Sequence, residues 1–315
     1  MTIRGLLQSK GILRSVGALI FIVILTRIDF SKIIEAFLTT NPFYYLAGLA
    51  LTLPVVGLSA IRWQKILSIL NIRYSLKDCF AVYSIGLYIG LLTPARLGDF
   101  IKVLYLTKEN FSVRRSLISV IGDKVFDSVT IVVFGIAGMA IFFKDSLNSS
   151  FYLTVSILIA GMVLYITCYR KRGNTVLAKI ADSLIPKKYK DSIKVNNLLD
   201  DLRLFNGRNA VWLSLLTLVR WSIFFLLSYL LILSLDIDIS FLNATISIAV
   251  AFIAAALPIS IAGIGTRDMA LILMFSRLGL SAEKAVAFSL LHLSISFLMV
   301  IIGFVFWMQR PLKAN

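Results

Sequence analysis

Six apolar runs, each long enough to cross a lipid bilayer, constrain the fold of this chain more than any other feature. A helix rises about 1.5 Å per residue, so about 20 apolar residues span the roughly 30 Å hydrocarbon core. The runs cover residues 12–28, 43–61, 117–143, 151–169, 211–233 and 285–307. They predict an all-α polytopic membrane protein.

The composition supports this class and bears on the partners. Of the 315 residues, 59% are hydrophobic and only 15% are charged, whereas about a quarter of a soluble domain is charged. The formal net charge is +16, which in a soluble protein would suggest nucleic acid. Because no basic–aromatic recognition module is visible, we attribute the charge to the positive-inside bias of membrane loops. We therefore expect membrane lipids as partners, and no nucleic acid.

Two further apolar regions are interrupted by proline and glycine. Region 79–92 resumes at 100–106 after its break, and region 243–257 resumes at 269–275. Irregular backbone at membrane depth is tolerated only where it is buried in protein or lines a cavity. We therefore predict two re-entrant hairpins in addition to six full spans; the alternative is eight transmembrane helices. The breaks are marked by Pro94, Gly98, Pro258, Gly263 and Gly265.

The charges of the connecting segments favour the hairpins. Segments 62–78, 107–116 and 170–210 are net positive, whereas segments 26–42, 144–150 and 234–242 are neutral or acidic. If each broken region enters and leaves on one side, all strongly basic segments are cytoplasmic and both termini lie inside. The two hairpins then have opposite orientations, as in the inverted repeats of many transporters. Residues 1–315 are expected to form a single domain with a cytoplasmic basic loop, 170–210.

Each break is followed by a basic and an acidic residue. The first has Arg96, Asp99 and Lys102, and the second has Arg267 and Asp268. If a helix restarts after each break, its free N–H groups and its positive dipole end, beside an arginine, suit a phosphate. The alternative is purely structural: proline at the first helical position and an internal Arg–Asp pair.

A third group of charged residues, Asp123, Lys124 and Asp127, lies in the first half of the run 117–143. The two carboxylates are four residues apart and share one helix face. Since that face cannot contact lipid, we expect it to meet Arg96, Lys102 or Arg267. A buried ion-pair network without a ligand is the alternative.

Three single residues and one pair complete the candidates. Arg220, near the middle of its run, is an anion contact or a partner for one of the aspartates, and Arg62 is an interfacial anchor or a site residue. His292, the only histidine, is read as a hydrogen-bonding residue rather than a proton relay. Asp236 and Asp238 would suit a membrane glycosyl or headgroup transferase. Since no metal-ligand cluster, P-loop or GxSxG motif is visible, we expect neither an enzyme nor a metal or cofactor.

At these residues the sequence resembles the transmembrane, flippase-like region of the lysylphosphatidylglycerol synthase family. The matching features are PARLGD from Pro94 to Asp99, DKVFD from Asp123 to Asp127, PISIAGIGTRD from Pro258 to Asp268, and Arg62-Trp63. The likeness covers nearly the whole chain, and where this chain departs from the family pattern, as at Asp99, Asp123 and Asp268, the charge is kept. The full synthases carry an additional aminoacyl-transfer domain, whose activity is not implied here.

The resemblance implies that a lipid or lipid-linked headgroup moves between leaflets. With the residues above, it suggests a translocator in the plasma (inner) membrane that binds an anionic phospholipid or a polyprenyl-phosphate-linked lipid. Arg96 and Arg267 would hold the phosphate, and the aspartates would neutralise them when the site is empty. An accessory membrane partner of a separate lipid-synthesis enzyme is a further alternative, and a homo-oligomer stays open.

Overall fold

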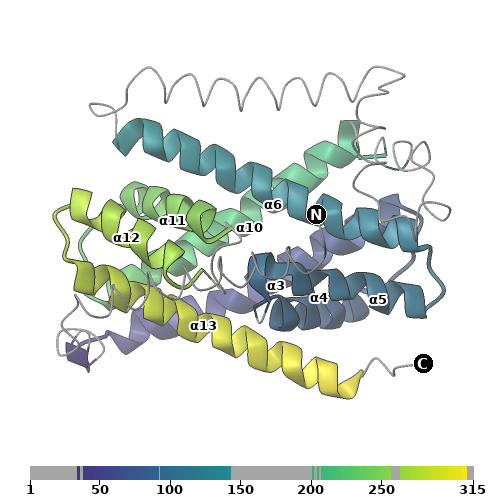
Figure 1. Cartoon of the computed structure of the whole chain (residues 1–315), viewed down its shortest axis with the longest axis horizontal. Helices are drawn as coiled ribbons and strands as arrows, with labels where there is room; N and C mark the ends of the chain where they lie inside the picture. Colours follow the sequence, from purple (N-terminus) through teal and green to yellow (C-terminus); the bar gives the residue numbers. More distant parts are fainter. Residues whose placement is uncertain are drawn as a thin grey trace, which may run out of the picture.

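The structure is a computed structural model that describes residues 34–35, 38–91, 93–142, 201, 204–205, 207–256 and 263–310. Within these residues the regular elements are all helical (Figure 1). They are α3 (Pro42–Ile69), α4 (Leu76–Leu91), the 3-10 helix η1 (Pro94–Phe100), α5 (Ile101–Lys108), α6 (Val113–Phe142), α10 (Gly207–Ser234), α11 (Phe241–Ala256), α12 (Thr266–Arg277) and α13 (Ala282–Gln309). The predicted spans 12–28 and 151–169, most of loop 170–210, and Pro258 lie outside the described residues.

The described helices confirm a polytopic membrane protein. Helices α3, α10 and α13 are each long and apolar enough to cross a membrane. Helix α3 continues through Ile69, eight residues beyond the predicted run. The sequence suggested an end at Arg62 because of its charge. Arg62 is instead fully buried, and its charge meets partners on other helices, so the helix continues past it.

The first broken region is a hairpin formed by α4, η1 and α5. At its mouth, the Tyr74 hydroxyl donates to the Glu109 carboxylate at 2.9 Å. Burial and this carboxylate raise the pKa of the Tyr74 phenol, so Tyr74 remains a donor at physiological pH. At its tip, the Thr93 hydroxyl accepts from the Gly98 N–H at 2.6 Å. The break is therefore an ordered 3-10 helix rather than irregular backbone.

The second broken region is a hairpin of α11 and α12. Gly263 and Gly265 precede α12 with φ of +77° and +89°, a left-handed conformation that only glycine adopts without cost. The outer ends of its two arms share one hydrophobic cluster, with Ile239 before α11 and Phe275 and Leu278 at the end of α12. Figure 1 shows α4 and α5 in one half of the bundle and α11 and α12 in the other, entering from opposite ends.

The spacing of the elements confirms an internal repeat. Helices α10, α11 and α12 each begin 165 residues after α3, α4 and α5 (207 against 42, 241 against 76, 266 against 101). The last pair, α13 and α6, is offset by 169 residues (282 against 113).

The helix ends follow the same repeat. Asn71 and Asp236 end α3 and α10 at positive φ, and Asn110 and Gly279 end α5 and α12 likewise. After Asn71, the N–H of Ile72 bonds back to the Leu67 carbonyl at 2.9 Å, and the equivalent bond follows the other three residues. This is the Schellman arrangement, which satisfies the last carbonyls of a helix in a tight reversal.

The two repeat units exchange packing partners. Helix α13 packs on α4, and α6 packs on α11, so the last helix of each unit covers the hairpin of the other. Glycines allow both close approaches: an added Cβ would lie 2.2 Å from Ser84 O at Gly303 and 2.2 Å from Ile253 Cδ1 at Gly135. The helix pair α3 and α10 packs across the centre. Since the hairpins point in opposite directions, the repeat is inverted.

The bundle has a basic end, which we define by Arg73 in the loop between α3 and α4 and by five basic residues at helix ends: Lys77, Lys108, Arg114, Arg115 and Arg310. Asp78 and Arg310 form an ion pair there at 2.6 Å. The opposite end, called the far end, contains Asn41 and residues 235–240 and 278–281. The Asn41 N–H donates to the Ser234 carbonyl at 2.7 Å and joins α3 to α10 at the far end.

The tip of the first hairpin provides a test of this packing. An added Cβ at Gly98 would lie 2.4 Å from the backbone carbonyl of Ile89, which cannot yield without opening the hairpin. We expect Gly98→Ala to lower the free energy of unfolding by roughly 1–3 kcal/mol, seen as a lower melting temperature in detergent. Gly57→Ala is the control, since its Cβ meets no atom within 4 Å. Equal melting temperatures for the two variants would contradict the packing of η1 on α4.

Candidate functional site

The centre of the candidate site is the Arg62 guanidinium on α3. Its Nε and Nη2 donate to Asp123 Oδ1 at 3.0 and 2.7 Å, and its Nη1 and Nη2 donate to the two Asp127 oxygens at 2.7 and 2.9 Å. Nη1 also donates to the Thr217 hydroxyl on α10 at 3.0 Å. Asp123 and Asp127 share one face of α6, as the sequence predicted. This planar fork on two carboxylates needs an arginine, because a lysine presents only a point charge.

Lys102, on α5, reaches one of these carboxylates, Asp123, from the hairpin. Its Nζ lies 3.4 Å from Asp123 Oδ2 and 4.0 Å from the centroid of the Tyr83 ring. The Trp63 ring centroid is 5.4 Å away. A buried ammonium is stabilised both by the carboxylate and by the negative faces of these rings. The sequence predicted that one of three basic residues would contact the face of Asp123 and Asp127. Lys102 is one of the three, and it contacts Asp123.

The tip of the first hairpin joins the cluster through Asp99 and Lys124, which form an ion pair. Gly90 on α4 makes room for Asp99, since an added Cβ would lie 2.9 Å from Asp99 Oδ1. The backbone of Pro94 and Arg96 belongs to η1. Their side chains lie outside the described residues, so the predicted role of Arg96 stays a prediction.

Arg220 on α10 completes this group. It forms an ion pair with Asp127, which is one of the two roles left open by the sequence, and its guanidinium carbon lies 4.5 Å from the centroid of the Trp221 ring. Its buried Nε has no hydrogen-bond partner within the described part of the chain. We call Arg62, Lys102, Lys124, Arg220, Asp99, Asp123 and Asp127 the charged cluster.

Arg267 belongs to a different contact set. Its Nη2 and Nε donate to the Ser289 hydroxyl on α13 at 2.6 and 3.1 Å, and it lies 3.7 Å from Asp268. The Ser289 hydroxyl in turn donates to Asp268. Of the three residues expected to meet the face of Asp123 and Asp127, namely Arg96, Lys102 or Arg267, Lys102 contacts Asp123. The described contacts of Arg267 are with Ser289 and Asp268. The hairpin that carries Arg267 enters from the far end, and its tip lies against α13, where Arg267 contacts Ser289.

The start of α12 also differs from the prediction of free N–H groups. The Gly265 N–H donates to Asp268 Oδ2 at 2.8 Å, which caps the helix. His292 lies one turn from Ser289, with its ring centroid 5.4 Å from that of Phe224 and 5.6 Å from that of Phe252. A cavity of about 10 Å³ separates Arg267, Phe252 and His292. That volume is about the size of one water, so this cavity, as bounded by the described residues, does not hold a headgroup.

Sequence reasoning missed the hydroxyls and rings that complete these sets. Thr217 lies one turn before Arg220, and Ser289 one turn before His292, so helical periodicity from the charged residues would have indicated both. Trp63 and Tyr83 surround Lys102, but no spacing connects them, because they come from different helices.

The acidic pair that suggested a transferase has a structural explanation. Asp236 is the residue that ends α10 at positive φ, and Asp236 and Asp238 are exposed while Ile237 and Ile239 between and after them are buried. Across the described residues, no group of three or more His, Cys, Asp or Glu side chains could hold a metal ion.

The burial of Arg62 leads to a stability test. We expect Arg62→Met to lower the free energy of unfolding by roughly 3–5 kcal/mol, because Asp123 and Asp127 lose a shared buried cation. Arg310→Met, which breaks the exposed pair with Asp78, should cost at most about 1 kcal/mol. The melting temperatures of the two variants are measured in detergent, and we expect a much larger decrease for Arg62→Met than for Arg310→Met. Equal losses would show that Arg62 does not hold the helices together.

Comparison with known proteins now adds the family. The family model described as the lysylphosphatidylglycerol synthase TM region matches residues 11–303. A UPF0104 membrane protein of Methanocaldococcus jannaschii is 24% identical, over 95% of this chain and 94% of its own length. One from Pyrococcus horikoshii is 26% identical over 92% of this chain and 93% of its own. No solved structure matches. The chain therefore belongs to the family of the lysylphosphatidylglycerol synthase transmembrane region.

Proposed function

We propose that this membrane protein moves a phosphate-bearing lipid headgroup between the two leaflets. The observation that carries the proposal is the composition of the charged cluster. Among the described residues it joins four cations to three carboxylates. Charges at membrane depth are costly unless they are balanced, so a cluster in which cations outnumber carboxylates among the described residues favours an anion. A phosphate group on a lipid supplies that charge.

The cluster has a closed side and an open side. The side chains of Arg62, Lys102 and Asp123 are at most 2% exposed, whereas those of Asp127 and Lys124 are 26% and 33% exposed. Arg220 lies beside the partly exposed Asp127, and its buried Nε has no hydrogen-bond partner among the described residues. A phosphate would therefore bind between Arg220 and Lys124 while Arg62 keeps its carboxylates.

The carboxylates have two roles in this proposal. They neutralise the cations when the site is empty, and Asp127 would contact a cationic part of a headgroup. The family model is named for lysylphosphatidylglycerol, whose headgroup combines a phosphate with an amine, and a cluster with both signs of charge suits that class. An anionic phospholipid and a polyprenyl-phosphate-linked lipid share the same phosphate chemistry.

The orientation follows from the charge of the ends. Arginine and lysine concentrate at the basic end, and the positive-inside bias favours the cytoplasm for that end. We place the protein in the plasma (inner) membrane with its C-terminus inside. The first hairpin then enters from the cytoplasm and the second from outside.

A liposome assay tests the function. Fluorescent phospholipids are placed in both leaflets, and dithionite bleaches the outer one. We expect purified protein to increase the bleached fraction beyond that of protein-free liposomes. Arg220→Ala should lower the rate at least about tenfold, the factor for one charge-assisted hydrogen bond. It should remain folded, because Arg62 still holds Asp127.

Arg208→Ala is the matched control, since Arg208 is exposed at the start of the same helix and should keep the wild-type rate. Arg96→Ala tests the remaining predicted phosphate contact in the same assay. Wild-type bleaching by folded Arg220→Ala would refute the role of the cluster, and no excess bleaching by folded wild-type protein would refute the function.

A further inference from the structure

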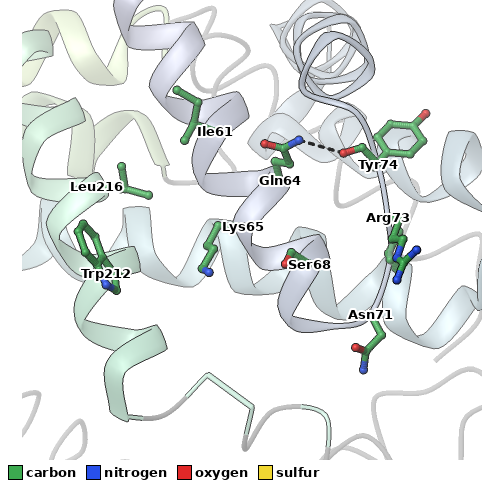
Figure 2. A pocket seen from close by; sticks show the side chains of 10 residues that line it. Ile61, Gln64, Lys65, Ser68, Asn71, Arg73, Tyr74, Trp212 and Leu216 are labelled. Carbon is green, nitrogen blue, oxygen red and sulfur yellow. Dashed lines mark hydrogen bonds between the residues drawn. The ribbon is translucent and has the colours of Figure 1, made fainter.

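At the basic end, the seam between α3 and α10 opens into a cleft. Its volume is about 900 Å³, which is in the range of small-molecule sites. One wall is the last part of α3 and the loop that follows it, and the other is the start of α10 (Figure 2). Figure 2 shows Lys65 on α3 and Trp212 on α10 on opposite walls. The charged cluster does not use these residues.

The cleft is positively charged. Lys65 and Arg73 line it and are exposed, and neither forms an ion pair with any described residue. All of its lining residues are described, and none is a carboxylate. Gln64 donates to the Tyr74 carbonyl at 3.0 Å and so holds the loop that carries Arg73 against α3. Two unpaired cations fixed on one cleft are suited to a phosphate group.

The same cleft has an apolar wall. Ile61 and Leu216 line its inner part, and Trp212, which is 50% exposed, lines its outer part. Tryptophan is enriched where a protein meets the membrane–water interface, because one side of the ring is apolar and the N–H is wet. A ligand that fits must therefore combine a phosphate with hydrocarbon.

The position of the cleft relates it to the charged cluster. Ile61 and Leu216 directly precede Arg62 and Thr217, which are joined by a hydrogen bond. Toward the far end the seam is closed: an added Cβ at Gly48 would lie 3.3 Å from Leu227 O, and Asn41 bonds to Ser234. The repeat thus has its α3–α10 seam open at one end and closed at the other, and the open end leads to the cluster.

We infer that this cleft binds the phosphate of a phospholipid headgroup on the basic side, before the headgroup reaches the charged cluster. Lys65 and Arg73 contact the phosphate, and Trp212, Ile61 and Leu216 contact the glycerol and the first acyl carbons. The inference rests on the proposed function for its place in transport, but the binding itself can be measured without transport.

A thiol introduced at Ser68, an exposed residue that lines the cleft, reports on occupancy. The purified full chain with Ser68→Cys is alkylated in detergent, and the modified peptide is quantified by mass spectrometry, which separates it from Cys79 and Cys168. The probes are dihexanoylphosphatidylglycerol, dihexanoylglycerol and inorganic phosphate. We expect the phospholipid alone to slow alkylation.

Lys65→Ala and Arg73→Ala, each added to Ser68→Cys, should weaken this protection at least about tenfold in phospholipid concentration. Lys77→Ala, an exposed cation of the basic end that does not line the cleft, should leave it unchanged. Equal protection by dihexanoylglycerol, or protection that survives both substitutions, would overturn the phosphate contact. Protection by inorganic phosphate as strong as by the phospholipid would assign the cleft to a free anion instead, and no protection would overturn the site.

The liposome assay keeps the two proposals apart. Protection at Ser68→Cys without excess bleaching would leave the cleft standing and remove the transport function. Excess bleaching without protection would remove the cleft and leave the transport function.

Discussion

The guanidinium of Arg62 fixes how three long helices and one hairpin meet. It joins two carboxylates of α6 and a hydroxyl of α10 to α3, and Asp123 then holds Lys102 of the hairpin. A charge at membrane depth must find such partners or leave the membrane. The electrostatic requirement of one side chain therefore determines helix packing and builds the candidate site in the same place.

The inverted repeat shows which parts of this site the two units share. Positions offset by 165 residues from Arg62 and Arg220 are occupied by Leu227 and Val55, and His292 is offset by 169 from Asp123. The glycine contacts are retained in both units: Gly98 meets the backbone at Ile89 and Gly90, and Gly263 meets Ala255, the counterpart of Gly90. The backbone geometry is thus repeated, and Arg267 occupies the position equivalent to Lys102. Arg62, Arg220 and Asp123 have uncharged counterparts, so most of the charged cluster occurs in one unit.

The sequence predicted the spans that lie in the described residues, and both broken regions, because hydropathy, proline and glycine act locally. Loop charges predicted the opposite hairpin directions for the same reason. The centre of the site could not be predicted, since Arg62 follows an apolar run and resembles an interfacial anchor until α6 is placed beside it. The choice among Arg96, Lys102 and Arg267 as partners of the α6 carboxylates could not be made, because one sequence does not show which neighbouring helix the tip of a hairpin contacts. The inverted repeat was expected from the opposite hairpin directions, but its 165-residue register was not visible, because few residues are identical at equivalent positions.

Cations along the α3–α10 seam differ in whether they are paired with carboxylates, and this difference affects the free energy of moving a phosphate from one set to the other. The cations of the open cleft, Lys65 and Arg73, have no carboxylate among the described residues, whereas those of the cluster are paired. In the proposed transport, a phosphate that left the cleft for the cluster would exchange solvated cations for cations already held by aspartates. It therefore meets no bare buried charge, and the cluster gives up no carboxylate, because Arg220 Nε is unused. Such an exchange leaves Lys65 and Arg73 to water, and the phosphate keeps positive partners at both places. A headgroup could then cross by thermal motion or with a coupled ion, and the charged cluster would lower the barrier equally in both directions.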